Sequence, residues 1–586
     1  MDSNPAALDS LVVLVANRGE IARRIIRTCT ELGIESVAVF ADPDADAPHV
    51  HEATKSEHIG PAALDESYLS IDAILDAAER SSATHIHPGY GFLAERADFA
   101  DAVIEAGLVW VGPSPDAMRS MASKIEARNV AVSAGVPIIE GYNESQDPDD
   151  LANAADDIGY PVLIKASAGG GGKGIRIANT ADEFADALQQ ARNEAMSAFG
   201  DDDVIVERYV TAPRHIEVQI VGDHHGHVID VGTRECSVQR RYQKVLEEAP
   251  APNLPYDVEK AIRAAAVKLA TSIDYDSAGT VEFIVDADTN EFFFLEMNTR
   301  IQVEHTVTEQ ITGLDLISAQ LAISTGIDRP PSADFFDNVR AHNPRHSFEA
   351  RITAEDAWNG HIPQTGVVSK LTIPDTEDVR WDAAITAGSE ITPYYDSMVG
   401  KLIVTAPTRI EALDGLRTAL STLAVEGLTT NIDFLLWLTG KTEIRAGMVT
   451  TRFLDETPLP RSSPFSGQVL SPWSDKTARR LTPHSSMFAF DSPSRDDRWH
   501  GTGASGNAGS EVLAPFPGLI TEVMVSAGDE VAAGQPLMTI EAMKMLHPIT
   551  AAGPATIDAV LVTTGDQVDG SQPLLTFVQP TSEGSP

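Results

Sequence analysis

Cysteine and long apolar runs are scarce in this chain of 586 residues. Its 2 cysteines, Cys29 and Cys236, are too few for a disulfide framework or a metal cluster, and we expect both to lie in the core. No apolar run is long enough to cross a membrane, and the opening MDSNPAALDS lacks the basic start and apolar stretch of a signal peptide. We therefore expect a cytoplasmic protein that does not insert in a membrane.

Basic residues are also few. The chain has 43 Lys and Arg residues against 86 Asp and Glu residues, which gives a formal net charge of −43. Nucleic-acid binding is not expected, because no basic stripe is present that could neutralise phosphates. The acidic residues are dispersed, which we interpret as adaptation to a salt-rich cytoplasm that screens their repulsion. An acidic surface that attracts a basic partner is the alternative.

The C-terminal part contains an internal repeat. VMVSAGDEVAAGQPL (523–537) and VLVTTGDQVDGSQPL (560–574) are identical at 8 of 15 positions. Short alternating strands with Gly-Asp turns predict a small all-β unit made of two related halves. Lys544, in EAMKM, follows the first half where a tight hairpin would expose it on a rigid base. Taken alone, it could also be a solvated turn lysine between core methionines.

A glycine-rich segment upstream indicates a nucleotide site. In YPVLIKASAGGGGKGIRI (160–177), four consecutive glycines join two apolar strands, and Lys165 lies in the first strand. Without Cβ atoms, such a loop lets backbone N–H groups close around phosphates. It is not a Walker A motif, because Gly174 stands where Ser or Thr is required. The strand–glycine–strand order resembles the lid of an ATP-grasp fold, and a hairpin with a flexible tip is the alternative.

A second segment, GTVEFIVDADTNEFFFLEMNTRIQVEH (279–305), predicts a metal site. It reads as two strands around a turn centred on Thr289, so that Glu282 faces Glu296. Facing carboxylates repel each other unless a cation lies between them, which suits Mg²⁺ and phosphates. A screened surface hairpin is the alternative. If the extended geometry continues, the residues at alternate positions beyond Glu296 point the same way: Asn298, Arg300, Gln302 and Glu304.

The chain resembles the α-subunit of biotin-dependent acyl-CoA carboxylases, a biotin carboxylase fused to a biotinoyl domain. The likeness rests on NRGEIA, HPGYGFLAE, EMNTRIQVEH, EARITAED and PYYDSMVGKL over about 8–455, and on APFPGLI and EAMKM. Ala168 and Tyr242 depart from the glycine and histidine usual in the family. The resemblance implies an α/β multidomain fold: a pre-ATP-grasp α/β domain (1–118), an ATP-grasp domain (119–338, lid about 138–210), an α+β C-terminal carboxylase domain (339–456), a flexible linker (457–510) and a small all-β biotinoyl barrel-sandwich (511–580).

The same resemblance implies the roles of individual residues. ATP would be bound by Lys124, Lys165, Gly169, Gly170, Gly171, Gly172, Glu207, Arg208, Val210, His215 and Gln239. Mg²⁺ (or Mn²⁺) would be held by Glu282, Glu296 and Asn298, and bicarbonate by Lys244, Arg300, Gln302 and the Val303 backbone. The catalytic residues would be Lys244, Arg300, the general base Glu304, and Arg351 facing the ureido oxygen of biotin; Lys544 would be biotinylated.

The implied function is that of a ligase which uses ATP and bicarbonate to carboxylate biotin on its own carrier domain. A biotin–protein ligase would attach the biotin. The domains leave no room for a carboxyltransferase, so we expect a separate β-subunit, in a complex where this chain is a homo-oligomer. Acetyl-CoA or propionyl-CoA would be the acceptor. The alternatives are the corresponding subunit of a two-chain pyruvate carboxylase, another ATP-grasp ligase with a lipoyl-type carrier, and a non-catalytic carrier.

Overall fold

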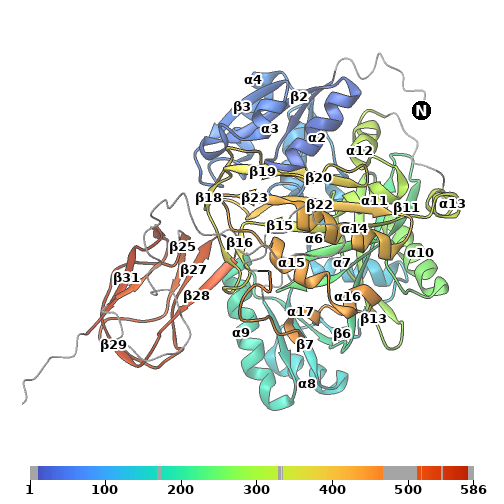
Figure 1. Cartoon of the computed structure of the whole chain (residues 1–586). Helices are drawn as coiled ribbons and strands as arrows, with labels where there is room; N and C mark the ends of the chain where they lie inside the picture. Colours follow the sequence, from blue (N-terminus) through green and yellow to red (C-terminus); the bar gives the residue numbers. More distant parts are fainter. Residues whose placement is uncertain are drawn as a thin grey trace, which may run out of the picture.

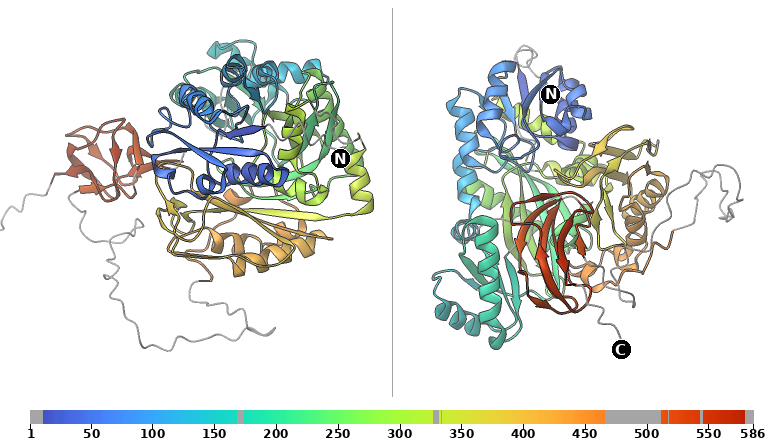
Figure 2. Two further views of the ribbon diagram at one scale, coloured as in Figure 1. Left: turned by 90° about the horizontal axis from the view of Figure 1, so that it is seen from above. Right: turned by 90° about the vertical axis from the view of Figure 1, so that its left-hand side faces the viewer.

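A computed structural model describes residues 11–167, 174–326, 332, 334–465, 511–516, 518–542 and 545–578. They form an α/β main part and a small β module on one side of it (Figure 1; both views of Figure 2). The glycines Gly169, Gly170, Gly171 and Gly172, most of the predicted linker, and Lys544 lie outside the described residues. Within the described part of the chain, no helix is both long and apolar enough to cross a bilayer.

The N-terminal sheet has five parallel strands in the order β3 (Lys55–Gly60), β2 (Glu35–Ala41), β1 (Val12–Val15), β4 (His85–His87) and β5 (Val109–Trp110). β1 is apolar at every position, as expected for a strand covered on both faces. Asn17, just after β1, donates from Nδ2 to the carbonyls of Pro88 and Tyr90, both at 2.7 Å. The motifs NRGEIA and HPGYGFLAE are thereby joined at one edge of the sheet. The helices are α2 (Gly19–Leu32), α3 (Pro48–Glu52), α4 (Ile71–Ser81) and α5 (Ala97–Glu105).

An eight-stranded antiparallel sheet forms the centre of the main part. Its order is β14 (Phe292–Asn298), β13 (Ala278–Asp286), β10 (Pro213–Gly222), β11 (Val228–Arg240), β12 (Gln243–Ala249), β15 (His346–Thr353), β22 (Met398–Ala406) and β20 (Val379–Ala383). β12 pairs with β15, with Leu246 opposite Ala350, so the sheet runs continuously from the predicted ATP-grasp part into the predicted C-terminal part. This sheet supplies most of the candidate site residues.

The predicted lid is a smaller sheet with its own helices. Its strands are β6 (Gly141–Tyr142), β9 (Val204–Arg208), β7 (Val162–Ala166) and β8 (Ile175–Ala178), next to α8 (Pro148–Ile158) and α9 (Ala181–Phe199). β7 and β8 pair antiparallel, with Lys165 opposite Ile175. The strand–glycine–strand order predicted from the sequence is therefore confirmed for the two strands.

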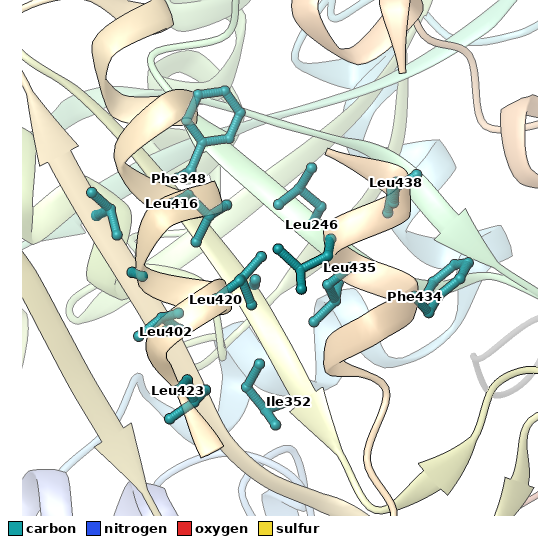
Figure 3. Close-up of a cluster of buried hydrophobic side chains, with 14 of the residues drawn as sticks. Leu246, Phe348, Ile352, Leu402, Leu416, Leu420, Leu423, Phe434, Leu435 and Leu438 are labelled. Carbon is teal, nitrogen blue, oxygen red and sulfur yellow. The ribbon is translucent and has the colours of Figure 1, made fainter. Parts of the chain in front are cut away.

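A large hydrophobic cluster holds the far end of the central sheet (Figure 3). Leu416 and Leu420 on α14 (Arg409–Thr422) and Leu435 on α15 (Ile432–Leu438) pack against Leu246 and Leu402 of the sheet. Each such side chain contributes about 1.5–3 kcal/mol when fully buried. The cluster therefore fixes β12, β15 and β22, from which Lys244, Arg351 and Lys401 project.

Shorter elements complete the main part. Between the N-terminal sheet and the lid lie α6 (Pro115–Ala122) and α7 (Lys124–Ser133), and the central sheet is accompanied by α10 (Tyr256–Ser272), α11 (His305–Thr312), α12 (Leu316–Ser324) and α13 (Phe335–His342). The C-terminal part adds β16 (Glu355–Asp356), β17 (Ile362–Pro363), β18 (Gly366–Val367), β19 (Lys370–Thr372), β21 (Glu390–Ile391), β23 (Ala424–Glu426), α16 (Thr442–Ala446) and α17 (Phe453–Glu456). Cys29 and Cys236 are both buried and free, as expected.

The β module, called the carrier module below (511–578), consists of two four-stranded sheets. One contains β24 (Glu511–Leu513), β31 (Pro573–Phe577), β29 (Ala555–Val560) and β26 (Glu530–Val531); the other contains β28 (Met545–Thr550), β27 (Pro536–Ala542), β25 (Gly518–Val523) and β30 (Gln567–Val568). The repeat is confirmed in the turns. Asp529 accepts from Ser526 N at 2.8 Å, and Asp566 accepts from Thr563 N at 2.7 Å. Gly528 and Gly565 have φ angles of 95° and 96°, which favour glycine.

Candidate active site

Two carboxylates face each other across neighbouring strands, as the predicted turn requires. Glu282 on β13 is paired with Glu296 on β14, and a bulge follows between Glu282 and Phe283. Burial and the charge of Glu282 raise the pKa of Glu296. Burial disfavours ionisation of Glu282 as well, but Lys244 and His215 hold its pKa well below the usual value. The pair thus carries an electrostatic cost that a divalent cation would relieve.

The residues after β14 do not continue as a strand, so the predicted alternation is wrong beyond Asn298. β14 ends at Asn298, and Glu304 is the N-cap of α11, with φ −81° and ψ 8°. The chain turns because His305 starts the helix, with its Nδ1 2.6 Å from the Gln302 carbonyl. Hydrogen bonds nevertheless bring the side chains together: Gln302 Nε2 donates to Glu282 at 2.7 Å, and Arg300 Nη2 donates to Asn298 Oδ1 at 2.9 Å.

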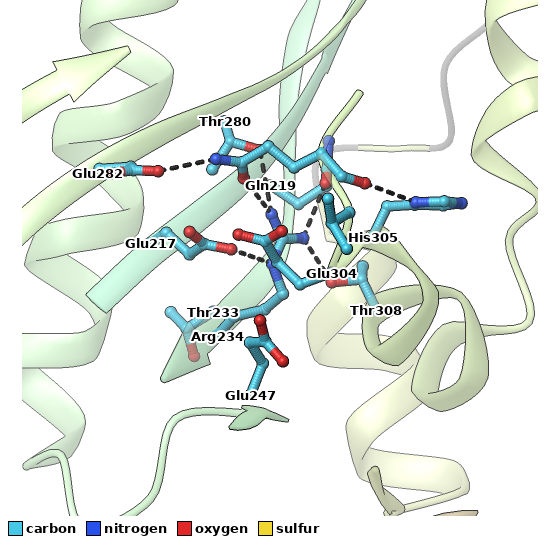
Figure 4. A network of polar contacts seen from close by, with 12 residues as sticks. Glu217, Gln219, Thr233, Arg234, Glu247, Thr280, Glu282, Glu304, His305 and Thr308 are labelled. Carbon is cyan, nitrogen blue, oxygen red and sulfur yellow. Dashed lines mark hydrogen bonds and ion pairs between the residues drawn. The ribbon is translucent and has the colours of Figure 1, made fainter. Parts of the chain in front are cut away.

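Lys244 on β12 is the cation at the centre of this group (Figure 4 shows its carboxylate neighbours). Its Nζ donates to Glu217 at 2.6 Å, to Glu282 at 3.0 Å and to Glu304 at 2.5 Å. Burial alone would lower the pKa of Lys244, but these three carboxylates raise it well above its usual value. Burial likewise opposes ionisation of Glu304, but Lys244 and Arg351 hold its pKa below the usual range. Glu304 is therefore an ionised carboxylate at neutral pH.

Arg351 on β15 approaches Glu304 from the other side. Its Nη2 donates to Glu304 at 3.0 Å, and its Nε donates to Glu247 on β12 at 2.5 Å. Burial alone would lower the pKa of Arg351, but Glu247 and Glu304 raise it. The predicted base and the predicted biotin-facing arginine are thus in direct contact.

Three residues at this site were missed by the sequence analysis: Glu217, Arg234 and Glu247. Arg234 is 0% exposed and donates to Glu217 and to several polar neighbours (Figure 4). Those neighbours, at 2.8–3.0 Å, are Gln219, Thr280, Gln302 and Thr308. A signal for Glu217 was present in PRHIEVQI, because it lies two residues after His215 on the same face of a strand.

The predicted nucleotide-binding residues come together at the lid. Lys165 Nζ lies 2.7 Å from Glu207 Oε2, and Lys124, at the start of α7, donates from its backbone N to the Ser167 carbonyl at 3.2 Å. Burial lowers the pKa of Lys124. The others lie close by in the fold: Arg208 is 5.2 Å from the ring of Phe293, Val210 is buried, His215 Nε2 is 2.8 Å from Glu282, and Gln239 Nε2 is 3.5 Å from His215 Nδ1.

Two remaining site residues take part in contacts at the edge of the group. Arg300 also lies 3.3 Å from Glu95. The Val303 carbonyl accepts from Lys401 Nζ at 2.5 Å, which fixes the turn that precedes Glu304. Tyr242, in the β11–β12 turn, is 52% exposed with φ 64°.

The donor set suits the predicted ligands. Two facing carboxylates and an amide oxygen are hard ligands for Mg²⁺, and the lysines of the lid and α7 suit phosphates. A glycine-rich lid, a carboxylate pair on two central strands and an acid-base group beside them define an ATP-grasp ligase. Four family models match consecutive parts of the chain: "Biotin carboxylase, N-terminal domain" (10–118), "Carbamoyl-phosphate synthase L chain, ATP binding domain" (123–330), "Biotin carboxylase C-terminal domain" (349–456) and "Biotin-requiring enzyme" (507–577).

Known proteins agree with these models. Biotin carboxylase 2 of Bacillus subtilis is 45% identical over 445 residues, which cover 76% of this chain and 99% of that protein. The mitochondrial methylcrotonoyl-CoA carboxylase subunit alpha of Glycine max is 47% identical over 444 residues, 76% of this chain and 60% of that protein. The match therefore spans about 60% of the length of that relative.

A solved structure shows the same likeness. The biotin carboxylase domain dimer of Hydrogenobacter thermophilus 2-oxoglutarate carboxylase, in complex with MgADP, ADP and bicarbonate, has a TM-score of 0.72 and 43% identity. The likeness covers 76% of this chain and 97% of that one. The chain belongs to the biotin carboxylase family and carries a biotin-type carrier region in addition. Its cofactors are biotin, ATP and Mg²⁺, as the sequence predicted.

Proposed function

We propose that the chain uses ATP and bicarbonate to carboxylate biotin on its own Lys544 and supplies the carboxyl group to a separate carboxyltransferase β-subunit of an acyl-CoA carboxylase. One observation carries the proposal: Lys244 and Arg351 converge on the ionised Glu304 beside the Glu282–Glu296 pair. The carrier region in the same chain provides the attachment site.

Binding of ATP is assigned to the lid and its neighbours. Lys124 and Lys165 bind phosphate oxygens, with His215, Gln239 and the glycine run, while Glu207, Arg208 and Val210 line the nucleotide on β9 and after it. Glu282, Glu296 and Asn298 would hold Mg²⁺, which supplies positive charge where the phosphoryl group is transferred. The Lys165–Glu207 ion pair, at 2.7 Å, keeps the lysine aligned before the nucleotide arrives.

Binding and deprotonation of bicarbonate are assigned to the group around Lys244. Lys244, Arg300, Gln302 and the Val303 backbone bind the anion, and Glu304 takes its proton. The low pKa of Glu304, maintained against burial by Lys244 and Arg351, keeps the base ionised. Arg234 holds Gln302 in place from below, through a 2.9 Å hydrogen bond to Gln302 Oε1.

Biotin is assigned to the Arg351 side of the site. When attached, biotin supplies the ureido nitrogen that accepts the carboxyl group. Arg351 binds the ureido oxygen, where negative charge develops, and its contact with Glu304 places that oxygen near the bicarbonate.

A contact between the carrier module and the main part supports delivery to this site. Ile362 of β17 packs against the hydrophobic core of the carrier module. His547 lies close to the β11–β12 turn: burial and the charges of Arg241 and Arg240 lower its pKa to about 4. Lys244 follows this turn directly in the sequence, so the carrier module rests beside a strand that enters the site.

The acceptor is proposed to be an acyl-CoA, and the chain to act as a homo-oligomer with its β-subunit. The methylcrotonoyl-CoA carboxylase relatives support an acyl-CoA. The 2-oxoglutarate carboxylase likeness favours a second candidate, a 2-oxo acid acceptor, as in a two-chain pyruvate carboxylase.

The test uses the full chain biotinylated by a biotin–protein ligase and purified with its β-subunit. We expect the mass increment of one biotin, bicarbonate-dependent ATP hydrolysis, and carboxyl transfer to one of acetyl-CoA, propionyl-CoA, methylcrotonoyl-CoA and pyruvate. Lys544→Arg is the matched control, which should keep carboxylation of free biotin but lose the mass increment and the transfer. Absence of bicarbonate-dependent ATP hydrolysis in the wild type would overturn the proposal.

A further inference from the structure

Two buried carboxyl groups that the proposed reaction does not use lie behind Arg351. Glu247 on β12 and Glu349 on β15 are directly paired across the two strands, and they are 1% and 0% exposed. Side chains of directly opposed strand residues stand about 4.5–5.5 Å apart at Cβ. Two ionised carboxylates so close and so dry would repel each other strongly.

Each of these carboxyl groups has one oxygen engaged and one without a partner. Glu247 Oε1 accepts from Arg351 Nε at 2.5 Å, and Glu349 Oε2 accepts from Thr306 Oγ1. Within the described part of the chain, Glu247 Oε2 and Glu349 Oε1 are buried without a hydrogen-bond partner. A buried oxygen of this kind is costly unless it gains a hydrogen bond. A single proton between the two would give both oxygens a partner.

We propose that Glu247 and Glu349 share one proton and that this pair is a positioning device for Arg351. Glu247 orients the guanidinium through Nε, which leaves Nη2 directed at Glu304 and the biotin side of the site. With the shared proton in place the pair carries one negative charge, which matches the single positive charge of Arg351. The inference rests on the proposed function, since it assigns Arg351 to biotin.

Charged groups from every neighbouring element act on the pair. Lys244 lies on the same strand as Glu247, and Glu304 begins α11; Lys401 on β22 and the buried thiol Cys236 on β11 complete the surroundings. Burial raises the pKa of Glu247 to about 7, although Arg351 opposes the shift. Burial raises the pKa of Glu349 to about 8, against Lys401 and with the help of the Glu247 charge.

Loss of the shared proton to solvent would place a second negative charge behind Arg351. The guanidinium would then be drawn toward Glu247 and Glu349, away from the ureido oxygen. Carboxylation of free biotin should therefore decline as the pH rises above about 8, while ATP binding should not change, because none of the nucleotide-binding residues contacts the pair.

The test compares Glu349→Gln and Glu247→Gln with the wild type, with free biotin as the substrate. The amide that Glu349→Gln introduces can donate to Glu247 without titrating, so this variant should keep neutral activity and lose the alkaline decline. Glu247→Gln loses the charged acceptor of Arg351, and its kcat/KM for biotin should fall about tenfold with KM for ATP unchanged. Glu259→Gln, a change at a buried carboxylate paired with Arg340 at 2.6 Å, is the matched control and should alter neither quantity.

Infrared difference spectroscopy of the folded wild type observes the proton directly. We expect a protonated-carboxyl C=O band at pH 7 that disappears at alkaline pH and is absent in Glu349→Gln but present in Glu259→Gln. Absence of that band in the wild type would overturn the inference, as would an unchanged alkaline decline in Glu349→Gln. Bicarbonate-dependent ATP hydrolysis, measured on the same samples, separates this failure from failure of the proposed function.

Discussion

Arg351 joins two carboxylates with different tasks, the proposed base Glu304 and the buried Glu247. Arg351→Ala should lower carboxylation of free biotin by about a hundredfold, the usual cost of removing one charge-stabilising donor. KM for ATP should stay unchanged, because Arg351 is bound to Glu247 and Glu304 rather than to the lysines of the lid.

Steady-state assays with free biotin and with ATP as the varied substrates measure both effects. Arg345→Ala, which removes an arginine whose partner is Asp378 at 3.6 Å, is the control. Wild-type turnover in Arg351→Ala would remove Arg351 from the proposed mechanism.

Part of the site could be predicted residue by residue from local sequence. The pairing of Glu282 with Glu296 follows from the position of one turn, so it needs no tertiary information. Glu217 and Glu247 could not be placed in this way, because they reach the site from β10 and β12, and only the pairing of distant strands brings them there. The alternation beyond Asn298 was wrong because a helix start overrides strand geometry.

Among the elements, α14 carries the packing that fixes the end of the central sheet (Figure 3). Leu416→Ala should lower the free energy of unfolding by about 2–5 kcal/mol, because it leaves a cavity against the sheet. Thr418→Ala, on the exposed side of the same helix, should change it by less than about 0.5 kcal/mol. Urea unfolding of both variants gives the comparison, and equal midpoints would contradict the packing argument.

The pairing of β12 with β15 should make stability depend on pH. The folded pKa values of Glu247 and Glu349, about 7 and about 8, lie above the usual 4.5, so the folded chain retains protons that the unfolded chain releases. Their contribution to stability is full below pH 4.5 and is lost as the pH rises through 7 to 8. Tm should therefore fall between pH 6 and pH 9, by less in Glu349→Gln than in the wild type or in Glu259→Gln. Equal slopes would contradict the shared-proton pair.

The continuity of the central sheet could not be predicted from local patterns. Each strand was readable from its own residues, but Leu246 and Ala350 are paired although about a hundred residues separate them. The small turns of the carrier module could be predicted, because each depends on four consecutive residues and on a glycine with positive φ.

Across the whole molecule, the carrier module and the main part have complementary charges where they meet. Residues 511–578 contain 8 acidic residues and a single basic one, Lys544, whereas the facing turn contains Arg240 and Arg241. Arg241→Glu should slow carboxylation of the tethered biotin several-fold and leave carboxylation of free biotin unchanged. Single-turnover measurements on the biotinylated chain test this, with Arg345→Glu as the charge-matched control. Equal loss with both forms of biotin would contradict a docking role.

The net charge of −43 also has a consequence for the whole chain. Salt shortens the screening length from about 10 Å at 0.1 M to about 3 Å at 1 M, which weakens the repulsion among the acidic residues. Tm should therefore rise steeply with KCl concentration, which differential scanning calorimetry measures. A Tm that does not depend on salt would leave the acidic surface to a basic partner instead.

The twin turns of the carrier module make its two halves interchangeable parts. SAGD at 526–529 and TTGD at 563–566 adopt the same bonded shape, so either segment could be transplanted into the place of the other without rebuilding the scaffold. What differs between the halves is what each scaffold half displays, and a copy of the lysine hairpin grafted onto the second half would turn a single-armed shuttle into a double-armed one.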